Sequence, residues 1–377
     1  MRILIAPNAF KHALTAPRAA EAIHKGLAAS KLKAEWLSLP AADGGDGTGS
    51  LLVQQLRGLA EPATVSDPLG RPIASSFGWL EAEKTAIIEM ADASGLRLIS
   101  PEERNPLLTT SVGMGQLMRK ALDKKPVKMI ICIGGSATVD AATGALEALG
   151  LVFFDADGQA LRNLPQPIDR LHGISTSELD SRLSACELVV LCDVENPLLG
   201  PQGAAAVFGP QKGASPADVV LLDNRLRNWR DVVQRQTGID MQSLLHGGAA
   251  GGTAASFSAV LGARLVGGAD YFLDLVGFDT ILDSVDLVIT GEGSLDQQTL
   301  HGKGPFAIAR RARNKNKKTI GLAGLIRDSD RPALAPHFDQ LICINKPGDD
   351  PEQLLANCYQ HLFRCAQELG DALSSET

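Results

Sequence analysis

The stretch LVITGEGSLDQQT, from Leu287 to Thr299, decides the fold class because it joins a strand pattern directly to a polar loop. The same order, an apolar run and then a loop rich in Gly, Asp, Asn, Ser or Lys, occurs five more times: ILIAPNAFK from Ile3, WLSLPAADGGDGT from Trp36, MIICIGGSATVD from Met129, LVVLCDVENP from Leu188 and TIGLAGLIRD from Thr319. Open parallel sheets bind ligands beyond the carboxyl ends of their strands. The pattern therefore predicts an α/β enzyme whose site is assembled from several strand ends.

Strand patterns and helix patterns alternate along the chain, which is typical of a parallel sheet covered by helices. Apolar runs predict strands near residues 2–6, 35–39, 85–90, 127–133, 187–192, 286–290, 318–323 and 340–345. Helical periodicity predicts helices near residues 17–30, 47–57, 107–124, 139–149, 216–236, 251–263, 305–316 and 351–371. Two helices have clear start signals, Thr15 before Pro17 and Ser215 before Pro216.

The length of 377 residues favours two domains, because domains commonly contain about 100–200 residues. We expect the first two and the last three strands to form a five-stranded, doubly wound domain from residues 1–66 and 284–377. Residues 67–283 would then be an inserted second α/β domain, left through the turn Asp67-Pro68-Leu69-Gly70 and closed near residues 275–283. The pattern equally allows the middle strands to extend a single large sheet.

The composition is typical of a globular protein and leaves a small anionic ligand possible. Hydrophobic residues make up 45% and charged residues 21% of the chain, and the formal net charge is −7 without a basic block, which argues against nucleic acid or a membrane surface as main partner. The six cysteines form no C-x-x-C pair, so we expect buried free thiols rather than zinc or disulfides. The short N-terminal apolar run does not fit a signal peptide, and a cytoplasmic location is expected.

Two N-terminal loops carry candidate binding residues. Lys11 follows the first strand and can bind a phosphate or carboxylate, or it is simply a solvated lysine. In the loop Asp43–Thr48, the glycines Gly44 and Gly45 permit close backbone approach, and the carboxylates of Asp43 and Asp46 can hold Mg²⁺. The alternative is an Asp-Gly turn that only caps the next helix.

The middle of the chain adds two further candidate loops. Gly134, Gly135 and Ser136 follow a strand and, with a helix expected from Val139, would suit a phosphate or a carboxylate, although packing also explains the glycines. Asp193 and Asn196 follow the strand LVVLC, and the loop that contains Lys212 comes soon afterwards. Asp193 is equally explained as a helix cap or turn residue.

The richest segment begins at Gly291. It contains two carboxylates, two hydroxyls and a lysine within one expected loop and the start of the next helix, in the residues Gly291, Glu292, Gly293, Ser294, Asp296, Thr299 and Lys303. A purely structural loop rarely needs this inventory, so it favours function. Nearby histidines are interpreted as neighbours rather than catalysts.

The absence of three sequence motifs argues against several classes of enzyme. The chain has no G-x-x-x-x-G-K-[ST] motif, no G-x-G-x-x-G after the first strand and no G-x-S-x-G elbow, which argues against P-loop nucleotidases, ordinary dinucleotide-binding folds and α/β-hydrolases. Lysines, aspartates and glycine-rich loops without a histidine base fit phosphoryl transfer. That reaction needs alignment, positive charge or Mg²⁺, and a carboxylate that accepts the proton of the acceptor hydroxyl.

The ordered set of motifs resembles the type 1 glycerate kinase family. The segments are APNAFKHALTA, PAADGGDGT, IGGSATVD, CDVENPLLG, FGPQKGAS, GAAGG, ITGEGSLDQQTLHGKGP and GLAG, which span residues 6–324 in the family's order. The resemblance implies ATP-dependent, Mg²⁺-dependent phosphorylation of D-glycerate, with 2-phosphoglycerate favoured over 3-phosphoglycerate. It also implies an α/β fold with a discontinuous flavodoxin-like parallel-sheet domain, an inserted second α/β domain and an active site in the cleft between them.

The chain departs from the family pattern at four positions in three segments. Family members often have D-S-F-K where this chain has Asn8-Ala9-Phe10-Lys11, an Asn where Val139 stands, and Glu at the position of Asp46. The first change removes a carboxylate and a hydroxyl, so Asn8 is not assigned as a metal ligand. The second removes an amide from the Gly134–Thr138 loop, while the third keeps the charge.

These observations lead to one expected mechanism. Lys11, Lys212 and Lys303, with the glycine-rich loops, are expected to neutralise the ATP phosphates and the glycerate carboxylate. Asp43, Asp193 and Asp296 are the candidates for Mg²⁺ ligation and for the base, and Asp193 is preferred as the base on its loop position. Kinases of another small hydroxy acid and a non-catalytic sensor of a nucleotide or acid metabolite are the alternatives.

Overall fold

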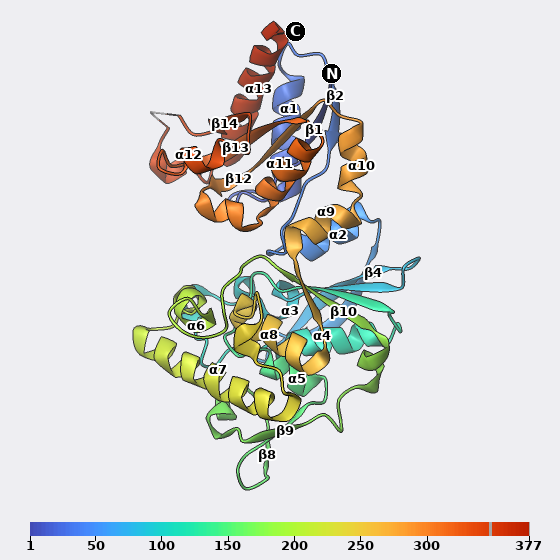
Figure 1. Ribbon diagram of the computed structural model, residues 1–377, viewed down its shortest axis with the longest axis vertical. Coiled ribbons are helices and arrows are strands. Elements are labelled where there is room, and N and C mark those ends of the chain that lie inside the picture. Colours follow the sequence, from blue (N-terminus) through green and yellow to red (C-terminus); the bar gives the residue numbers. More distant parts are fainter. Residues whose placement is uncertain (347–348, 377) are drawn as a thin grey trace. The chain divides into compact units, whose positions relative to one another are not determined.

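The computed structural model describes residues 1–346 and 349–376, drawn in Figure 1. The chain divides into two compact units, the first made of Met1–Asp43 with Ala269–Thr377 and the second of Gly44–Gly268. Their limits differ from the domain boundaries expected at 66/67 and 283/284, and the domain division stays a prediction. No helix among the described residues is long and apolar enough to cross a membrane.

The first unit contains a five-stranded parallel sheet in the order β14-β13-β12-β1-β2. Its strands are β1 (Arg2–Ile5), β2 (Glu35–Ser38), β12 (Leu287–Leu295), β13 (Lys318–Ile326) and β14 (Gln340–Cys343). Numbered within the unit, this order is 2-1-3-4-5, the flavodoxin-like order of doubly wound sheets. The expected pairing of the first two strands with the last three is therefore confirmed.

Helices cover both faces of this sheet. On one face α1 (Ala16–Ala28) and α13 (Cys358–Glu376) lie side by side and form a core with apolar residues of β1, β12 and β13. On the other face α11 (Gly304–Asn314) packs near α12 (Arg331–Leu334) around a smaller core. The remaining helices are α9 (Gly268–Leu275) and α10 (Phe278–Asp283).

Local sequence explains how the two long helices meet. Thr15 is the N-cap residue of α1, and Pro17 lies in its first turn, as the start signal predicted. Ala19, Ala20 and Ala22 are buried, and their small side chains allow close packing of this helix. A Cβ on Gly26 would lie 2.3 Å from the Phe363 carbonyl oxygen, so a glycine is required where α1 and α13 approach.

The second unit contains a six-stranded mixed sheet in the order β11-β10-β6-β5-β4-β3. Its strands are β3 (Leu59–Ser66), β4 (Pro72–Leu80), β5 (Thr85–Glu89), β6 (Lys128–Cys132), β10 (Glu187–Cys192) and β11 (Arg264–Gly267). The strands β5, β6, β10 and β11 pair parallel with their neighbours, whereas β3 pairs antiparallel with β4, and β4 with β5. Because this sheet is separate, the alternative of one large sheet is wrong.

The helices of this unit, except the first, contribute to one large apolar core, which includes the buried Trp229 and Phe257. They are α2 (Thr48–Gln55), α3 (Ala91–Ser94), α4 (Val112–Leu122), α5 (Thr143–Ala148), α6 (Ala204–Phe208), α7 (Pro216–Thr237) and α8 (Ala249–Leu261). The longest, α7, starts with a capping box between Ser215 and Asp218, as its start signal predicted. A small antiparallel sheet has the order β8-β7-β9, with strands Ala160–Leu161, Val152–Phe154 and Gly173–Ser175.

All eight predicted strands occur, but several predicted details are wrong. The turn Asp67–Gly70 joins the hairpin β3–β4 within the second unit and is not an exit from a domain. Residues 291–295 continue β12 and pair with β13, so the segment from Gly291 is a strand before it becomes a loop.

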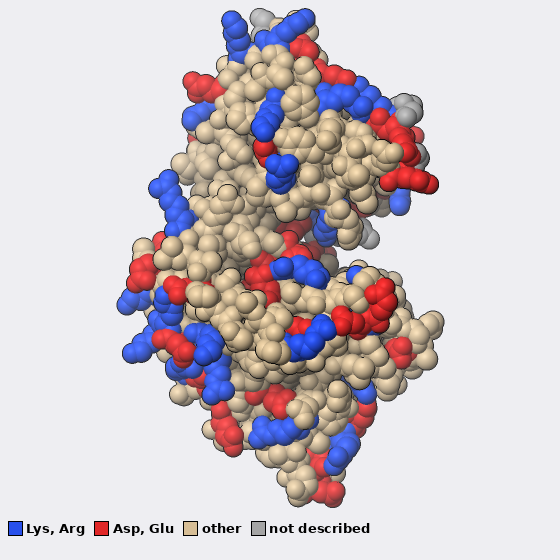
Figure 2. Space-filling model, turned by 180° about the vertical axis from the view of Figure 1, so that it is seen from behind, with Lys and Arg blue, Asp and Glu red and all other residues tan. Residues whose placement is uncertain are grey.

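On the face shown in Figure 2, cationic and anionic side chains are interspersed.

Candidate active site

In the first unit, polar side chains gather at the carboxyl ends of β1, β2 and β12. The Asn8 amide N–H donates to the Gly291 carbonyl oxygen over 2.8 Å, which ties the end of β1 to β12. The Asn8 side chain donates from Nδ2 to Asp43 Oδ2, also over 2.8 Å and in a buried position. Asn8 therefore holds the Asp43 carboxylate at the strand edge that parallel sheets use for ligands.

Glu292 is the central ionisable group of this cluster. Its side chain is 5% exposed. The pKa of the Glu292 carboxyl is raised to about 7, chiefly by burial and also by Asp43, against the lowering effects of Lys303, a hydrogen bond from Thr299 and Lys11. Two carboxylates and two ammonium groups thus interact electrostatically within one cluster. Strongly shifted ionisable groups of this kind are concentrated at functional sites.

The residues after β12 form a compact turn below Glu292. Thr299 Oγ1 donates to Glu292 Oε1 over 3.0 Å, and the Thr299 amide N–H donates to the Asp296 carbonyl oxygen over 3.0 Å. Lys303 is the N-cap residue of α11. A Cβ on Gly304 would lie 3.1 Å from Asn8 Nδ2, so a residue without a side chain lets the start of this helix approach β1.

In the second unit, two predicted glycine-rich loops lie directly against each other. A Cβ on Gly134 would lie within 2.6 Å of backbone atoms of Gly45 and Asp46. Gly135 has a φ of 70° and packs against the Asp46 side chain. Only glycine allows this approach, because other side chains would collide with the opposite loop. The sequence identified both loops, and the structure brings them together.

Lys212 is buried beneath the second of these loops. Its ammonium group donates to Ser136 Oγ and to the Thr138 carbonyl oxygen, each over 2.7 Å, and the side chain is 2% exposed. Desolvation lowers the pKa of Lys212 to about 7, and Asp140 partly opposes this shift. In this structure Lys212 supports the loop from inside and does not present its charge to solvent.

The helix expected directly after this loop begins later than predicted. α5 starts at Thr143, and before it Ala141 and Ala142 have φ values of 49° and 56°. The expectation that the loop runs into a helix from Val139 is therefore wrong. The GAAGG segment folds against this bend, since a Cβ on Gly251 would lie 2.3 Å from the Thr138 carbonyl oxygen. Non-glycine residues with positive φ are strained and are enriched at functional sites.

Asp193 and Asn196 follow β10, as expected. The Asn196 side chain donates to the Gln202 carbonyl oxygen over 2.9 Å, and the backbone carbonyl oxygen of Asn196 accepts from the Gly248 amide N–H. Asn196 therefore stabilises the loop after β10. Asp193 is half-buried and is one of the groups that raise the pKa of the adjacent Cys192.

Three charged residues at this site of the second unit were not predicted from the sequence patterns. Glu89, at the end of β5, accepts backbone hydrogen bonds from the Asp43–Thr48 loop and the start of α2, and Arg97 lies 3.5 Å from Asp46. Asp140 is buried and accepts hydrogen bonds from the Ser111 hydroxyl and amide. A carboxylate at the end of an otherwise apolar strand was the signal for Glu89. Arg97 and Asp140 had no comparable signal.

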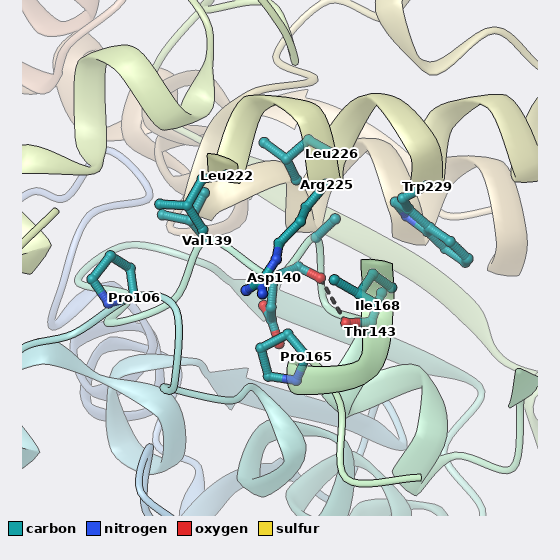
Figure 3. Close-up of a pocket in the computed structure, with 11 residues that line it drawn as sticks. Pro106, Val139, Asp140, Thr143, Pro165, Ile168, Leu222, Arg225, Leu226 and Trp229 are labelled. Atoms are coloured by element: carbon teal, nitrogen blue, oxygen red, sulfur yellow. Dashed lines mark hydrogen bonds between the residues drawn. The ribbon is translucent and has the colours of Figure 1, made fainter. Parts of the chain in front are cut away.

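A small cavity lies behind the Val139–Thr143 bend. Figure 3 shows its mostly apolar lining, including Leu222, Leu226 and Trp229 of α7, with Asp140 and Arg225 as the charged members. Its volume is about 10 Å³, which is the space of about one water molecule. This cavity is too small for a metabolite.

The carboxylates of the first unit fit a magnesium ion in part. Among residues 1–346 and 349–376, no three His, Cys, Asp or Glu side chains form a group that could hold a metal. Magnesium in phosphoryl-transfer sites is commonly held by one or two carboxylates, with phosphates and waters as the other ligands. Asp43, which interacts electrostatically with Glu292, is compatible with that arrangement. Metal ligation by Asp43, Asp193 and Asp296 stays a prediction.

The predicted site residues thus fall into two groups, one in each unit. The first unit brings together Asp43, Glu292, Thr299, Asp296, Lys11 and Lys303 at the ends of its strands, with Gly291, Gly293 and Ser294 in the β12 extension. The second unit brings together Gly45, Asp46, Gly134, Gly135, Ser136 and Lys212. Gly44 packs against Gly268 and Leu191 of that unit. The expected active site in the cleft stays a prediction.

Comparisons with known proteins agree over the whole chain. The family described as the glycerate kinase family matches residues 3–374. Glycerate kinase of Bacillus subtilis strain 168 is 40% identical over 374 residues, which are 99% of this chain and 98% of that protein. Glycerate 2-kinase of Escherichia coli K12 is 38% identical over 374 residues, with the same coverage of 99% and 98%. A crystal structure provisionally named glycerate kinase 2, from Salmonella typhimurium LT2, has a TM-score of 0.83 at 39% identity and covers 100% of this chain and 99% of its own.

Proposed function

This chain belongs to the glycerate kinase family, and we propose that it transfers the γ-phosphoryl group of ATP to D-glycerate. As a member of this family it is a kinase that acts on an alcohol group. The product we propose is 2-phosphoglycerate, for which the name of the Escherichia coli relative, glycerate 2-kinase, is the support.

The observation that carries this proposal is the charged cluster around Glu292. Phosphoryl transfer requires positive charge on the transferring group and carboxylates that orient a metal ion or a hydroxyl group. Lys303 and Lys11 supply ammonium groups, and Asp43 and Glu292 supply carboxylates, within electrostatic reach of one another at the end of a parallel sheet. A site that bound only an anion would gain nothing from two carboxylates beside the lysines.

We assign roles to the residues of the first unit as follows. Lys11 and Lys303 stabilise the negative charge of the transferring phosphoryl group. Asp43 and Asp296 are the proposed Mg²⁺ ligands in this unit, and a bound Mg²⁺ would neutralise phosphate charge and align the phosphoryl group. Asn8 and Thr299 orient Asp43 and Glu292 through the hydrogen bonds described above.

In the second unit, the paired glycine-rich loops bind an anionic group through their backbone amides. Gly45, Gly134 and Gly135 supply the close backbone approach, and Lys212 supports this surface through Ser136 rather than contacting phosphate directly. Asp193 is the proposed base that accepts the proton of the attacking hydroxyl and a third proposed Mg²⁺ ligand. The hydroxyl oxygen then forms a bond to the γ-phosphorus while the bond from this phosphorus to ADP breaks.

A coupled assay of ADP formation tests the proposal. The purified protein is assayed with Mg-ATP and, in separate reactions, D-glycerate, L-glycerate, lactate and glycolate. Activity that is highest with D-glycerate supports the proposal. Higher activity with another acid would make the protein a kinase of that acid, and ligand binding without turnover would make it a sensor. Phosphorus NMR of the product then identifies the phosphorylated hydroxyl.

A further inference from the structure

Glu89 links a strand of the second unit to the glycine-rich loop before α2. Its Oε1 accepts the Gly47 amide N–H over 2.6 Å, and its Oε2 accepts the Ser50 amide N–H over 3.1 Å. Gly47, the N-cap residue of α2, has a φ of 88° and no side chain that can cap the helix. Glu89, which lies 39 residues further along the chain from Ser50, therefore provides the cap that the helix itself lacks.

The surroundings of Glu89 are shaped to receive this carboxylate. The side chain is only 3% exposed. A Cβ on Gly49 would lie 2.8 Å from Glu89 Oε2 and 3.2 Å from its Cβ, so the first turn of α2 has room for the carboxylate because residue 49 is glycine. Both oxygen atoms of Glu89 are used as acceptors, which a glutamine side chain with its single oxygen cannot reproduce.

The position of Glu89 also connects the two glycine-rich loops. Glu89 is paired in register with Cys132 on β6, and Gly134 follows two residues later. On the other side, Glu89 holds Gly47, and Gly45 and Asp46 immediately before it are the residues that Gly134 touches. The Glu89 side chain thus links β5, whose neighbour β6 leads to Gly134, with the Gly45–Gly47 loop that Gly134 contacts.

We propose that Glu89 is a positioning residue that fixes the Gly45–Gly47 backbone against Gly134 and Gly135, so that both loops present their amides to one anionic ligand. The identity of that ligand, the ATP phosphates or the glycerate carboxylate, rests on the proposed function. The positioning of the loop by Glu89 does not rest on it.

The surroundings of Glu89 move its pKa into the pH range in which enzymes are commonly assayed. Its pKa is raised to about 7, chiefly by burial and also by Asp92 and Asp46, against the lowering effect of the hydrogen bonds from the Gly47 and Ser50 amides. Arg97 pairs with both aspartates, and the Cys132 thiol is a further ionisable neighbour. Only the carboxylate form accepts both amide hydrogen bonds at full strength, so the loop should be held most firmly above about pH 7.

Three variants of the full-length protein test this inference. Glu89→Gln removes the charge and one acceptor, and Glu89→Asp keeps the carboxylate on a shorter chain. Glu103→Gln is the matched control, because Glu103 also accepts a backbone amide in the same unit, from Ser100 over 2.9 Å at the start of the short 3-10 helix Pro101–Glu103. Each variant is examined by amide hydrogen exchange of the peptide that covers residues 44–52, and by KM and kcat with Mg-ATP and D-glycerate from pH 6 to 8.5.

We expect faster exchange in residues 44–52 of Glu89→Gln and a KM for at least one substrate that is about tenfold higher, as expected for a lost charge-assisted hydrogen bond, with a smaller change in kcat. Glu89→Asp should recover part of both effects, and Glu103→Gln should match the wild type. In the wild type KM should rise below pH 7, and this rise should be smaller in Glu89→Gln, where Glu292 still titrates in the same range.

Unchanged exchange in Glu89→Gln would overturn the inference. So would a lowered unfolding temperature with unchanged KM values, because that result indicates support of the fold alone. If Glu89→Gln does not fold, Glu89→Asp decides the question by the same measurements. If the wild type fails to phosphorylate D-glycerate, the exchange measurement still tests Glu89, and only the proposed function is lost.

Discussion

The ammonium group of Lys212 lies 2.7 Å from Ser136 Oγ, inside the second unit and beneath the loop that follows β6. An ordinary lysine remains protonated to about pH 10.5, but burial lowers the pKa of Lys212 to about 7. Between these two pH values the unfolded chain binds a proton that the folded protein has released. Stability must therefore rise with pH across this window.

Lys212→Met should remove this pH dependence. Below pH 7 the wild type is destabilised by a buried charge on Lys212. The free energy of unfolding of Lys212→Met is therefore highest, relative to that of the wild type, below pH 7. From pH 7 to 9 the wild type should gain about 1–3 kcal/mol on the variant, from about 1.4 kcal/mol per pKa unit. Thermal unfolding of both proteins at several pH values measures this difference, and Lys120→Met, at an exposed lysine, is the control.

Parallel curves for the wild type and Lys212→Met would show that Lys212 stays protonated in the folded protein.

Glu292 should give the opposite pH dependence. Burial raises its pKa from 4.5 to about 7, so folding takes up a proton between these values and wild-type stability should fall as pH rises through them. Glu292→Gln should remove this contribution. Thr299→Val deletes the hydrogen bond that favours the charged form, and it should extend the fall above pH 7.

Thermal unfolding in EDTA without nucleotide is the measurement, because a bound cation would change the ionisation of Glu292. If Thr299→Val and the wild type lose stability over the same pH range, the Thr299 hydroxyl does not control Glu292.

The strand order of the first unit could be predicted because its signals are local and strong. Apolar runs such as those at Ile3 and Leu287 are long enough to indicate buried strands, and parallel strands need helical connections that the sequence also contains. The strands β3 and β4 were missed because their exposure alternates weakly and Pro62 interrupts the first one. Their turn at Asp67 was consequently read as a domain exit.

The site could be predicted as a set of loops, but not as a set of contacts. Gly134 and Gly45 are recognisable as loop glycines, whereas their mutual contact depends on which strands are neighbours. Burial is also hidden from a sequence: Lys212, expected to neutralise phosphate charge, is buried and donates to Ser136 and Thr138, and its phosphate role stays a prediction. The positive φ values of Ala141 and Ala142 could not be predicted, because alanine normally favours a helix.

Lys303→Ala should reduce phosphoryl transfer. We place Lys303 at the transferring phosphoryl group, where one electrostatic donor typically contributes about 3–4 kcal/mol, so kcat/KM should fall by about 10²–10³-fold. The control is Lys318→Ala, since Lys318 is exposed at the amino end of β13, opposite to the ligand edge of the sheet. An unchanged kcat/KM for both ATP and D-glycerate in Lys303→Ala would exclude this role.

Asp193→Asn should lower kcat by about 10²–10⁴-fold, the usual range for loss of a general base. The amide cannot accept the proton of the attacking hydroxyl, while its shape is almost unchanged. Glu195→Gln changes a nearby exposed carboxylate after the same strand and should retain activity. Steady-state kinetics at saturating substrates measure the effect. A variant that turns over at the wild-type rate would leave the base to another carboxylate.

Gly134→Ala tests whether the two glycine-rich loops must touch. The new Cβ would lie 2.4 Å from the Gly45 carbonyl carbon and 2.6 Å from the Asp46 amide nitrogen, distances that force the loops apart. If both loops bind one anionic ligand, affinity for ATP or D-glycerate should fall at least about tenfold, as expected when precise backbone contacts are displaced. Gly173→Ala is the matched control, because its Cβ would meet only Gln236 Nε2 at 3.8 Å. Isothermal titration with each substrate measures the affinities, and wild-type affinity in Gly134→Ala would mean that the loops act independently.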